Sequence, residues 1–130
     1  MEIFLHHIYE YKKGLRRMVL HTAPLVQRNL IEKKLKSQDI SYLIIPVNST
    51  KINVFFGDPH CVNIIRTFGD VNLSQLSDEQ DFILGTLLGY DLVLQCKRYL
   101  KRKRYCEGLK IRKTANIAQS FYPGEYKYAS

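Results

Sequence analysis

The sequence predicts an α+β domain in which a small three-stranded mixed sheet, in the order β-α-β-β-α, packs with helices, the last of which is long. Three observations predict this fold. The chain has 130 residues, 45% of them hydrophobic, and can therefore bury one core. Apolar runs of strand and helix character follow one another along it. Asn48, Ser49 and Thr50 lie between two strand-like runs, which favours a hairpin.

The first elements follow from apolar spacing. Residues 2–12 carry apolar side chains at helical intervals and predict a helix that ends near Gly14. Residues 17–22 form a short apolar run between a glycine and a proline, which favours a buried strand. Thr22 is then a suitable cap for a helix whose apolar stripe lies within residues 26–35.

The middle of the chain predicts a hairpin followed by a helix. Residues 41–47 and 52–56 are rich in tyrosine, isoleucine, valine and phenylalanine, which favour strands. Asp58 next has the character of an N-cap, and Pro59 suits the first helical position. A helix is therefore predicted from this point to about Phe68.

The last helix has a clear start in the sequence. Ser77 and Gln80 have the spacing of a capping box, and the acidic residues between and after them complement the positive end of a helix. We predict one long helix from here to about Arg104, kinked at Gly89.

The order of these elements also predicts a topology and an assembly. The right-handed crossover rule makes the first two strands parallel, and the hairpin makes the third antiparallel to the second. The long helix is apolar on every side, through Phe82, Ile83, Leu84, Leu87, Leu88, Tyr90, Leu92, Val93 and Leu94. Burying all of its sides requires a second chain or a wrapped tail, so we predict a homodimer.

Domain limits and compartment follow from composition. We predict one α+β domain over residues 1–106 and an irregular tail, basic and rich in tyrosine, over residues 107–130. The three cysteines lack the spacing of a disulfide framework, which is typical of a reducing compartment. No secretory-signal pattern and no apolar run long enough for a bilayer is evident. We therefore expect a cytoplasmic protein without membrane contact.

The net charge of +8 is concentrated in one segment, residues 97–113, where nine basic residues stand with one acidic residue, Glu107. The basic residues are Lys97, Arg98, Lys101, Arg102, Lys103, Arg104, Lys110, Arg112 and Lys113. A helix dipole favours cations at a C-terminus, which accounts for two or three of the nine. An electrostatic partner should meet the protein at this segment.

Three stretches of the chain also carry a family resemblance: FLHHIYEYKKGLRRMVLHT, INVFFGDPHC and DFILGTLLGYDLVLQCKRY. They resemble an uncharacterised bacterial domain-of-unknown-function family, number twenty twenty-three, over about residues 1–105. The resemblance implies a homodimer of three strands and about five helices. It further implies that members are often encoded beside flavodoxin genes, and it implies no established activity.

Cys61 and His60 form the candidate chemical site. Cys61 lies in the first turn of the helix opened by Asp58, where free N–H groups and the dipole lower a thiol pKa. The same position falls on an apolar stripe, where a buried cysteine acts as a small hydrophobe. The histidines and cysteines have no zinc-like spacing, so we predict neither a metal site nor a cofactor, although a composite site built by folding stays open.

These features leave three hypotheses of function. The first is a non-enzymatic protein whose basic segment binds an acidic protein, such as a flavodoxin-like redox protein, because a positive patch steers association with acidic surfaces. The second is nucleic-acid binding, in which the same segment neutralises phosphates and Tyr99 and Tyr105 stack on bases. The third is a thiol-dependent redox or metal-binding protein, or an enzyme, that works through Cys61 and His60.

Overall fold

A computed structural model of the protein describes residues 1–70 and 72–114, with side chains through Arg104. The elements in these residues are α1 (Glu2–Lys12), β1 (Met18–Pro24), α2 (Arg28–Ser37), β2 (Ser41–Pro46), β3 (Lys51–Gly57), α3 (Pro59–Arg66), α4 (Asp78–Leu87) and α5 (Leu92–Thr114). Short 3-10 turns precede α2 and α4. The α+β class and the three strands agree with the sequence prediction, and the five helices agree with the number that the family resemblance implies.

The sheet has the order β1-β3-β2, and both pairs of neighbours are antiparallel. The first two strands do run in the same direction, as predicted, but β3 lies between them, so the prediction of a mixed sheet was wrong. The reason is the character of β3. From Ile52 to Gly57 this strand is buried on both faces, whereas β2 is only half-buried. A strand that is apolar on both faces gains most from the central position, where neighbours cover both of its edges.

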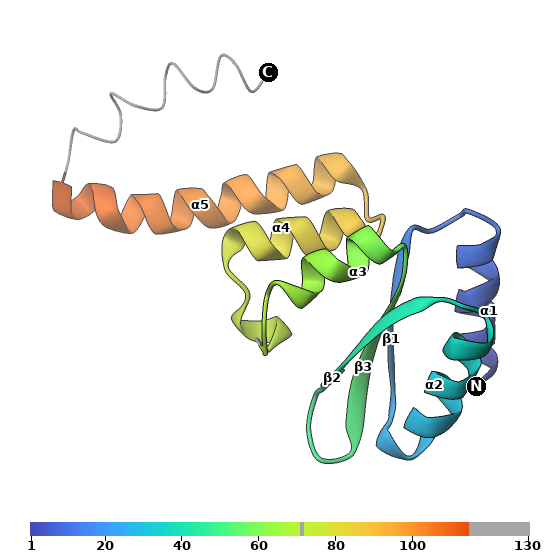
Figure 1. The fold of residues 1–130 in the computed structure, drawn as a ribbon. Coiled ribbons are helices and arrows are strands. Elements are labelled where there is room, and N and C mark those ends of the chain that lie inside the picture. The colour runs from blue at the N-terminus through green and yellow to red at the C-terminus, as the bar shows by residue number, and fades with distance from the viewer. Residues whose placement is uncertain (71, 115–130) are drawn as a thin grey trace.

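Three layers result, as Figure 1 shows: α1 and α2 cover one face of the sheet, and α3 and α4 cover the other. Alternate residues of β3 supply both cores. Val54 and Phe56 pack with Phe4 of α1, and Phe55 packs with Val62 of α3. Because side chains of a strand alternate between faces, a single apolar strand organises two hydrophobic clusters.

Two of the predicted helix starts are confirmed by their caps. The Asp58 carboxylate accepts the His60 N–H at 2.8 Å, and Pro59 occupies the first position of α3. Ser77 Oγ accepts the Gln80 N–H at 3.1 Å, and Gln80 Oε1 accepts the Ser77 N–H at 3.0 Å. These reciprocal bonds satisfy N–H groups that have no partner inside a helix.

The predicted cap at Thr22 was wrong. β1 continues to Pro24, and α2 begins at Arg28 without a side-chain cap. The Thr22 hydroxyl donates instead to Asn53 Oδ1 of the neighbouring strand, at 2.6 Å. This cross-strand bond gives the side-chain oxygen of the buried Asn53 a donor, which explains why the threonine belongs to the sheet.

The predicted long helix is two helices. Gly89 has a φ of +81°, and the Tyr90 N–H closes the end of α4 by donating to the Gly85 carbonyl. Glycine adopts this left-handed conformation without the cost that a β-carbon adds, so it ends a helix where the sequence suggested a kink. Asp91 then caps α5, accepting the Leu94 N–H at 2.9 Å. In Figure 1, α5 turns back and lies along α4.

The C-terminal helix extends beyond the predicted domain limit. α5 continues to Thr114, past residue 106, and the remainder of the predicted tail, residues 115–130, lies outside the described residues. Among the helices of the described part of the chain, none has the length and apolarity required to cross a bilayer.

Candidate functional site

The basic segment meets the acidic first turn of α4. Arg98 donates two hydrogen bonds to the Asp81 carboxylate, at 2.8 and 3.1 Å. Arg102 bridges Asp78 at 2.8 Å and Asp81 at 3.0 Å. On the same side, Lys103 pairs with the third acidic residue of that turn, Glu79, at 2.8 Å. The return of α5 along α4 therefore matches cations of one helix with anions of the other.

The electrostatic effect of these contacts is mutual. The hydrogen bond from Arg98 lowers the pKa of Asp81 more than burial raises it, and the same contact raises the pKa of Arg98. Hydrogen bonds from Lys103 and Tyr99 lower the pKa of Glu79, and the contact with Glu79 raises the pKa of Lys103. Both sides of the helix pair thus stay charged over a wide pH range.

The contacts divide the nine predicted binding cations into three groups. The first group, which pairs with carboxylates of α4, is Arg98, Arg102 and Lys103. Lys97, Lys101 and Arg104 are exposed, and among the described side chains they make no salt bridge. The last group is Lys110, Arg112 and Lys113, which lie on the final turns of α5, beyond the described side chains.

The exposed group shares one side of the helix. Lys97, Lys101 and Arg104 follow one another at intervals of four and three residues, the spacing that places side chains on one helix face. Leu100, which is partly exposed, stands between them. We call these four residues the outer basic face. It spans about 10 Å along the helix axis, given a rise of about 1.5 Å per residue.

An apolar surface adjoins the start of α5. Leu92, Val93 and Leu94 are 57%, 59% and 60% exposed. Of the apolar residues predicted to encircle one long helix, Leu84 and Leu88 are buried against the sheet, because the chain reverses at Gly89 and α4, not α5, packs there. The apolar start of α5 is left at the surface.

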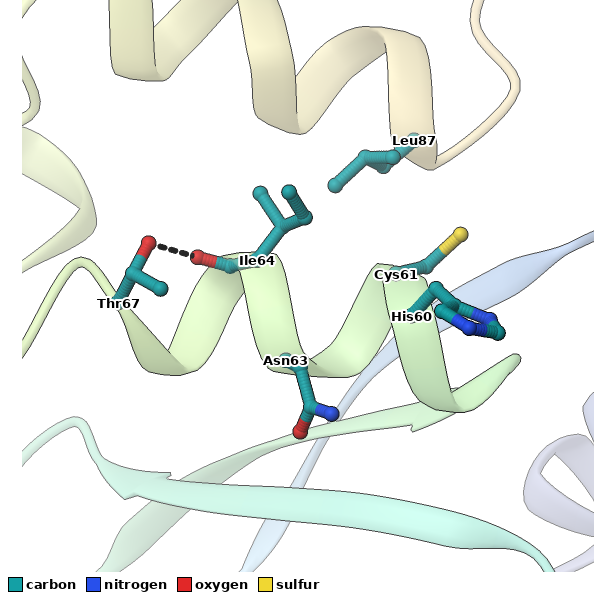
Figure 2. Close-up of a pocket in the computed structure, with 6 residues that line it drawn as sticks. All are labelled: His60, Cys61, Asn63, Ile64, Thr67 and Leu87. Carbon is teal, nitrogen blue, oxygen red and sulfur yellow. Dashed lines mark hydrogen bonds between the residues drawn. The ribbon is translucent and has the colours of Figure 1, made fainter.

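A shallow groove of about 370 Å³ lies between α3 and α4. Figure 2 shows Ile64 of α3 pointing toward Leu87 of α4, with Cys61 further along the same helix. The hydroxyl of Thr67, at the end of the groove, donates to the Ile64 carbonyl at 2.6 Å and so completes the helix end. The groove is mainly apolar and has few groups that could orient a small polar ligand.

Cys61 and His60 lie in different surroundings, although they are neighbours in the chain. Burial, and then the nearby Asp58 carboxylate, raise the pKa of the Cys61 thiol, although Arg17 opposes them. The His60 side chain is 96% exposed, and its Nδ1 lies 3.2 Å from Asp58. Cys61 packs against the second hydrophobic cluster, as the apolar-stripe interpretation predicts. The electrostatic surroundings thus favour a thiol over a thiolate.

Other candidate ligands are also dispersed. Within residues 1–70 and 72–104, no three histidine, cysteine, aspartate or glutamate side chains lie close enough together to hold a metal ion. Cys61 and Cys96 are both free thiols.

The sequence interpretation missed the role of Asp78, Glu79 and Asp81 as ion-pair partners. They were assigned to the helix start, and they do occupy it. The available signal was their combination with Gly89. A glycine that ends one helix allows the chain to reverse, and the reversal here brings the acidic first turn against cations seventeen to twenty-four positions later.

The fold and these contacts define a small three-layer α+β domain with a charge-paired helix hairpin on one face. The chain matches the family model described as "Protein of unknown function (DUF2023)" over residues 2–102, and it belongs to that family. No curated protein matches the chain.

Proposed function

We propose that this protein is a non-enzymatic binding protein whose outer basic face docks an acidic protein partner. The observation that carries the proposal is the division of the cations on α5. Arg98, Arg102 and Lys103 have carboxylate partners inside the fold, whereas Lys97, Lys101 and Arg104 present their charge to solvent. A row of exposed cations beside Leu100 suits a partner surface that combines carboxylates with an apolar contact.

The same geometry makes nucleic acid the weaker alternative. Tyr99, a predicted stacking residue, packs edge-on against Phe82, and its hydroxyl donates to Glu79 at 2.8 Å. Its ring therefore packs in the contact between α4 and α5 and is not free to stack on a base. Tyr105, the other predicted stacking residue, lies beyond the described side chains.

A flavodoxin-like redox protein is the partner we favour. The family resemblance implies that members are often encoded beside flavodoxin genes, and flavodoxins are typically acidic. A cationic face of this kind raises the association rate more than the final affinity. Such binding suits a transient redox partner, and it agrees with a cytoplasmic location, in which Cys61 and Cys96 stay reduced.

The test is retention of an acidic flavoprotein by the tagged full chain, from lysate with and without nuclease treatment. The variant Lys97→Glu/Lys101→Glu/Arg104→Glu should weaken retention about tenfold or more, because like charges then face each other. The matched control Lys12→Glu/Lys33→Glu/Lys51→Glu changes net charge equally on exposed residues elsewhere and should bind better than the first variant. Loss of all binding after nuclease treatment would support the nucleic-acid alternative instead.

Self-association is a second candidate property, favoured by the apolar start of α5. Leu92, Val93 and Leu94 are more than half exposed, and identical uncharged surfaces can meet across a twofold axis despite the net positive charge. We propose that this surface forms a homodimer. Val93→Ser/Leu94→Ser should shift the mass measured by light scattering toward the monomer, whereas Val26→Ser, at a residue that is also strongly exposed, should not.

The thiol-dependent alternative has less support. Burial raises the pKa of Cys61, and the His60 ring lies beside Asp58, so neither residue activates the other in this arrangement.

A further inference from the structure

A cluster of basic groups lies between α1 and β1, on the opposite face of the sheet from the groove. The rings of His7 and His21 have centroids 5.5 Å apart, in an edge-to-face arrangement. Arg16 Nη1 lies 3.4 Å from His7 Nδ1, a distance at which the guanidinium donates a hydrogen bond when that nitrogen carries no proton. Glu10 Oε1 lies 3.4 Å from the same nitrogen. We call His7, His21, Arg16 and Glu10 the histidine seam.

In the histidine seam, the carboxylate of Glu10 stands against several side chains that carry or can gain a positive charge. Glu10 also lies 4.0 Å from Arg16 and 3.7 Å from His6, so one carboxylate serves three basic side chains. Among the described residues, His21 has no carboxylate within salt-bridge distance. Burial, then His7 and the N-terminal amine, lower the pKa of His21. A proton on His21 therefore enters a half-buried site that offers no counter-charge.

This seam lies where α1 is attached to the domain. Phe4 and Ile8 are 0% and 5% exposed, and the Phe4 ring packs against both His21 and Phe56. The neighbouring elements α2 and β3 place apolar side chains in the cluster beneath. A cation–π contact with Phe4 would return part of the cost of a charged His21, but the two rings are tilted by 45°.

We propose that the histidine seam is a pH-sensitive latch, which holds α1 on the sheet while His21 is neutral and loosens it when His21 is protonated. A proton on His21 puts a cation beside the His7 ring, and His21 has no carboxylate partner among the described residues. The sign follows from the lowered pKa of His21: its stabilising effect is complete above the unfolded value of about 6.5 and is lost as pH falls through the lower folded value.

The latch is tested by hydrogen exchange of the α1 amides in the full chain at pH 7.5 and pH 5.5, corrected for intrinsic rates and referenced to α3. We expect α1 to lose protection at the lower pH and α3 to keep it. Each pKa unit by which folding lowers the His21 value multiplies the open population about tenfold below both values. The variant His7→Gln/His21→Gln should lose this pH dependence, and the exposed-site control His60→Gln should retain it.

Equal pH dependence in the wild type and the His7→Gln/His21→Gln variant would overturn the latch, as would unchanged α1 protection in the wild type. If the double variant does not fold, nuclear magnetic resonance titration of His21 decides the question. The latch requires that His21 titrate below 6.5 in the wild type and closer to 6.5 in His7→Gln, because the variant removes a like charge. Titration of His21 above 6.5 refutes it.

Discussion

Replacement of Asp81 by Asn tests whether the ion pairs hold α5 against α4. The Asp81 side chain is 20% exposed and contacts two arginines, Arg98 through a bidentate pair and Arg102 at 3.0 Å. Exposed pairs contribute about 0.2–1 kcal/mol each, and bidentate geometry lies at the upper end of that range. Arg98 is 57% exposed, so solvent screens its contribution. We expect Asp81→Asn to lower the free energy of unfolding by about 1.5 kcal/mol.

Urea unfolding measures this loss directly. With an m-value of about 1.5 kcal/mol/M, typical of a small domain, the midpoint should fall by about 1 M without a change in m. The difference should shrink in high salt and as pH falls below 3.8, the ordinary pKa of the carboxyl, because Asp81 contributes stability only while it is ionised. A double-mutant cycle with Arg98→Gln should return a coupling energy of about 1 kcal/mol.

The control is Asp70→Asn, which removes a carboxylate from an exposed position with no ion pair among the described residues. It should leave the midpoint nearly unchanged. Equal effects of the two substitutions, or a coupling energy near zero, would refute the assignment of Asp81 to the helix-pair contact.

Three further predictions concern single residues. Gly89→Ala should lower stability by about 1–2 kcal/mol in urea unfolding, because alanine is strained at a φ of +81°, and Gly89→Asn should cost less. Equal losses for both would contradict the left-handed cap. Ser77→Ala should cost about 1 kcal/mol in the same assay through loss of the capping box, whereas Ser77→Asp should retain most of the stability. Cys61 should react with iodoacetamide at pH 7.5 more slowly than a thiol of an unfolded peptide, since burial raises its pKa. Faster reaction, measured by mass spectrometry, would restore the reactive-thiol hypothesis.

Local features of the sequence accounted for most of the elements. The helical spacing in residues 2–12 predicted α1 with its observed bounds. The Asp58-Pro59 pair and the Ser77–Gln80 capping box marked the starts of α3 and α4. Such signals lie within one helical turn, so they need no knowledge of the rest of the chain.

The order of the strands could not be obtained in the same way. The crossover rule gave the correct relative direction of β1 and β2, but it says nothing of a later strand that inserts between them. The apolar character of β3 on both faces was visible in the sequence, and it is the property that favours the centre of a sheet. Thr22 was misassigned for a related reason, because its partner Asn53 is distant in the chain.

For the candidate site, the sequence located the excess charge in residues 97–113 but not its distribution around the helix. The sequence alone determined that the protein is basic and that its excess charge lies in one segment. Only the tertiary structure decided which cations pair with carboxylates and which stay exposed to solvent. The reversal at Gly89 brings Asp78, Glu79 and Asp81 against α5. Charge is a property of each residue, whereas its neutralisation depends on contacts between residues far apart in the chain, and those contacts arise when the two helices pack.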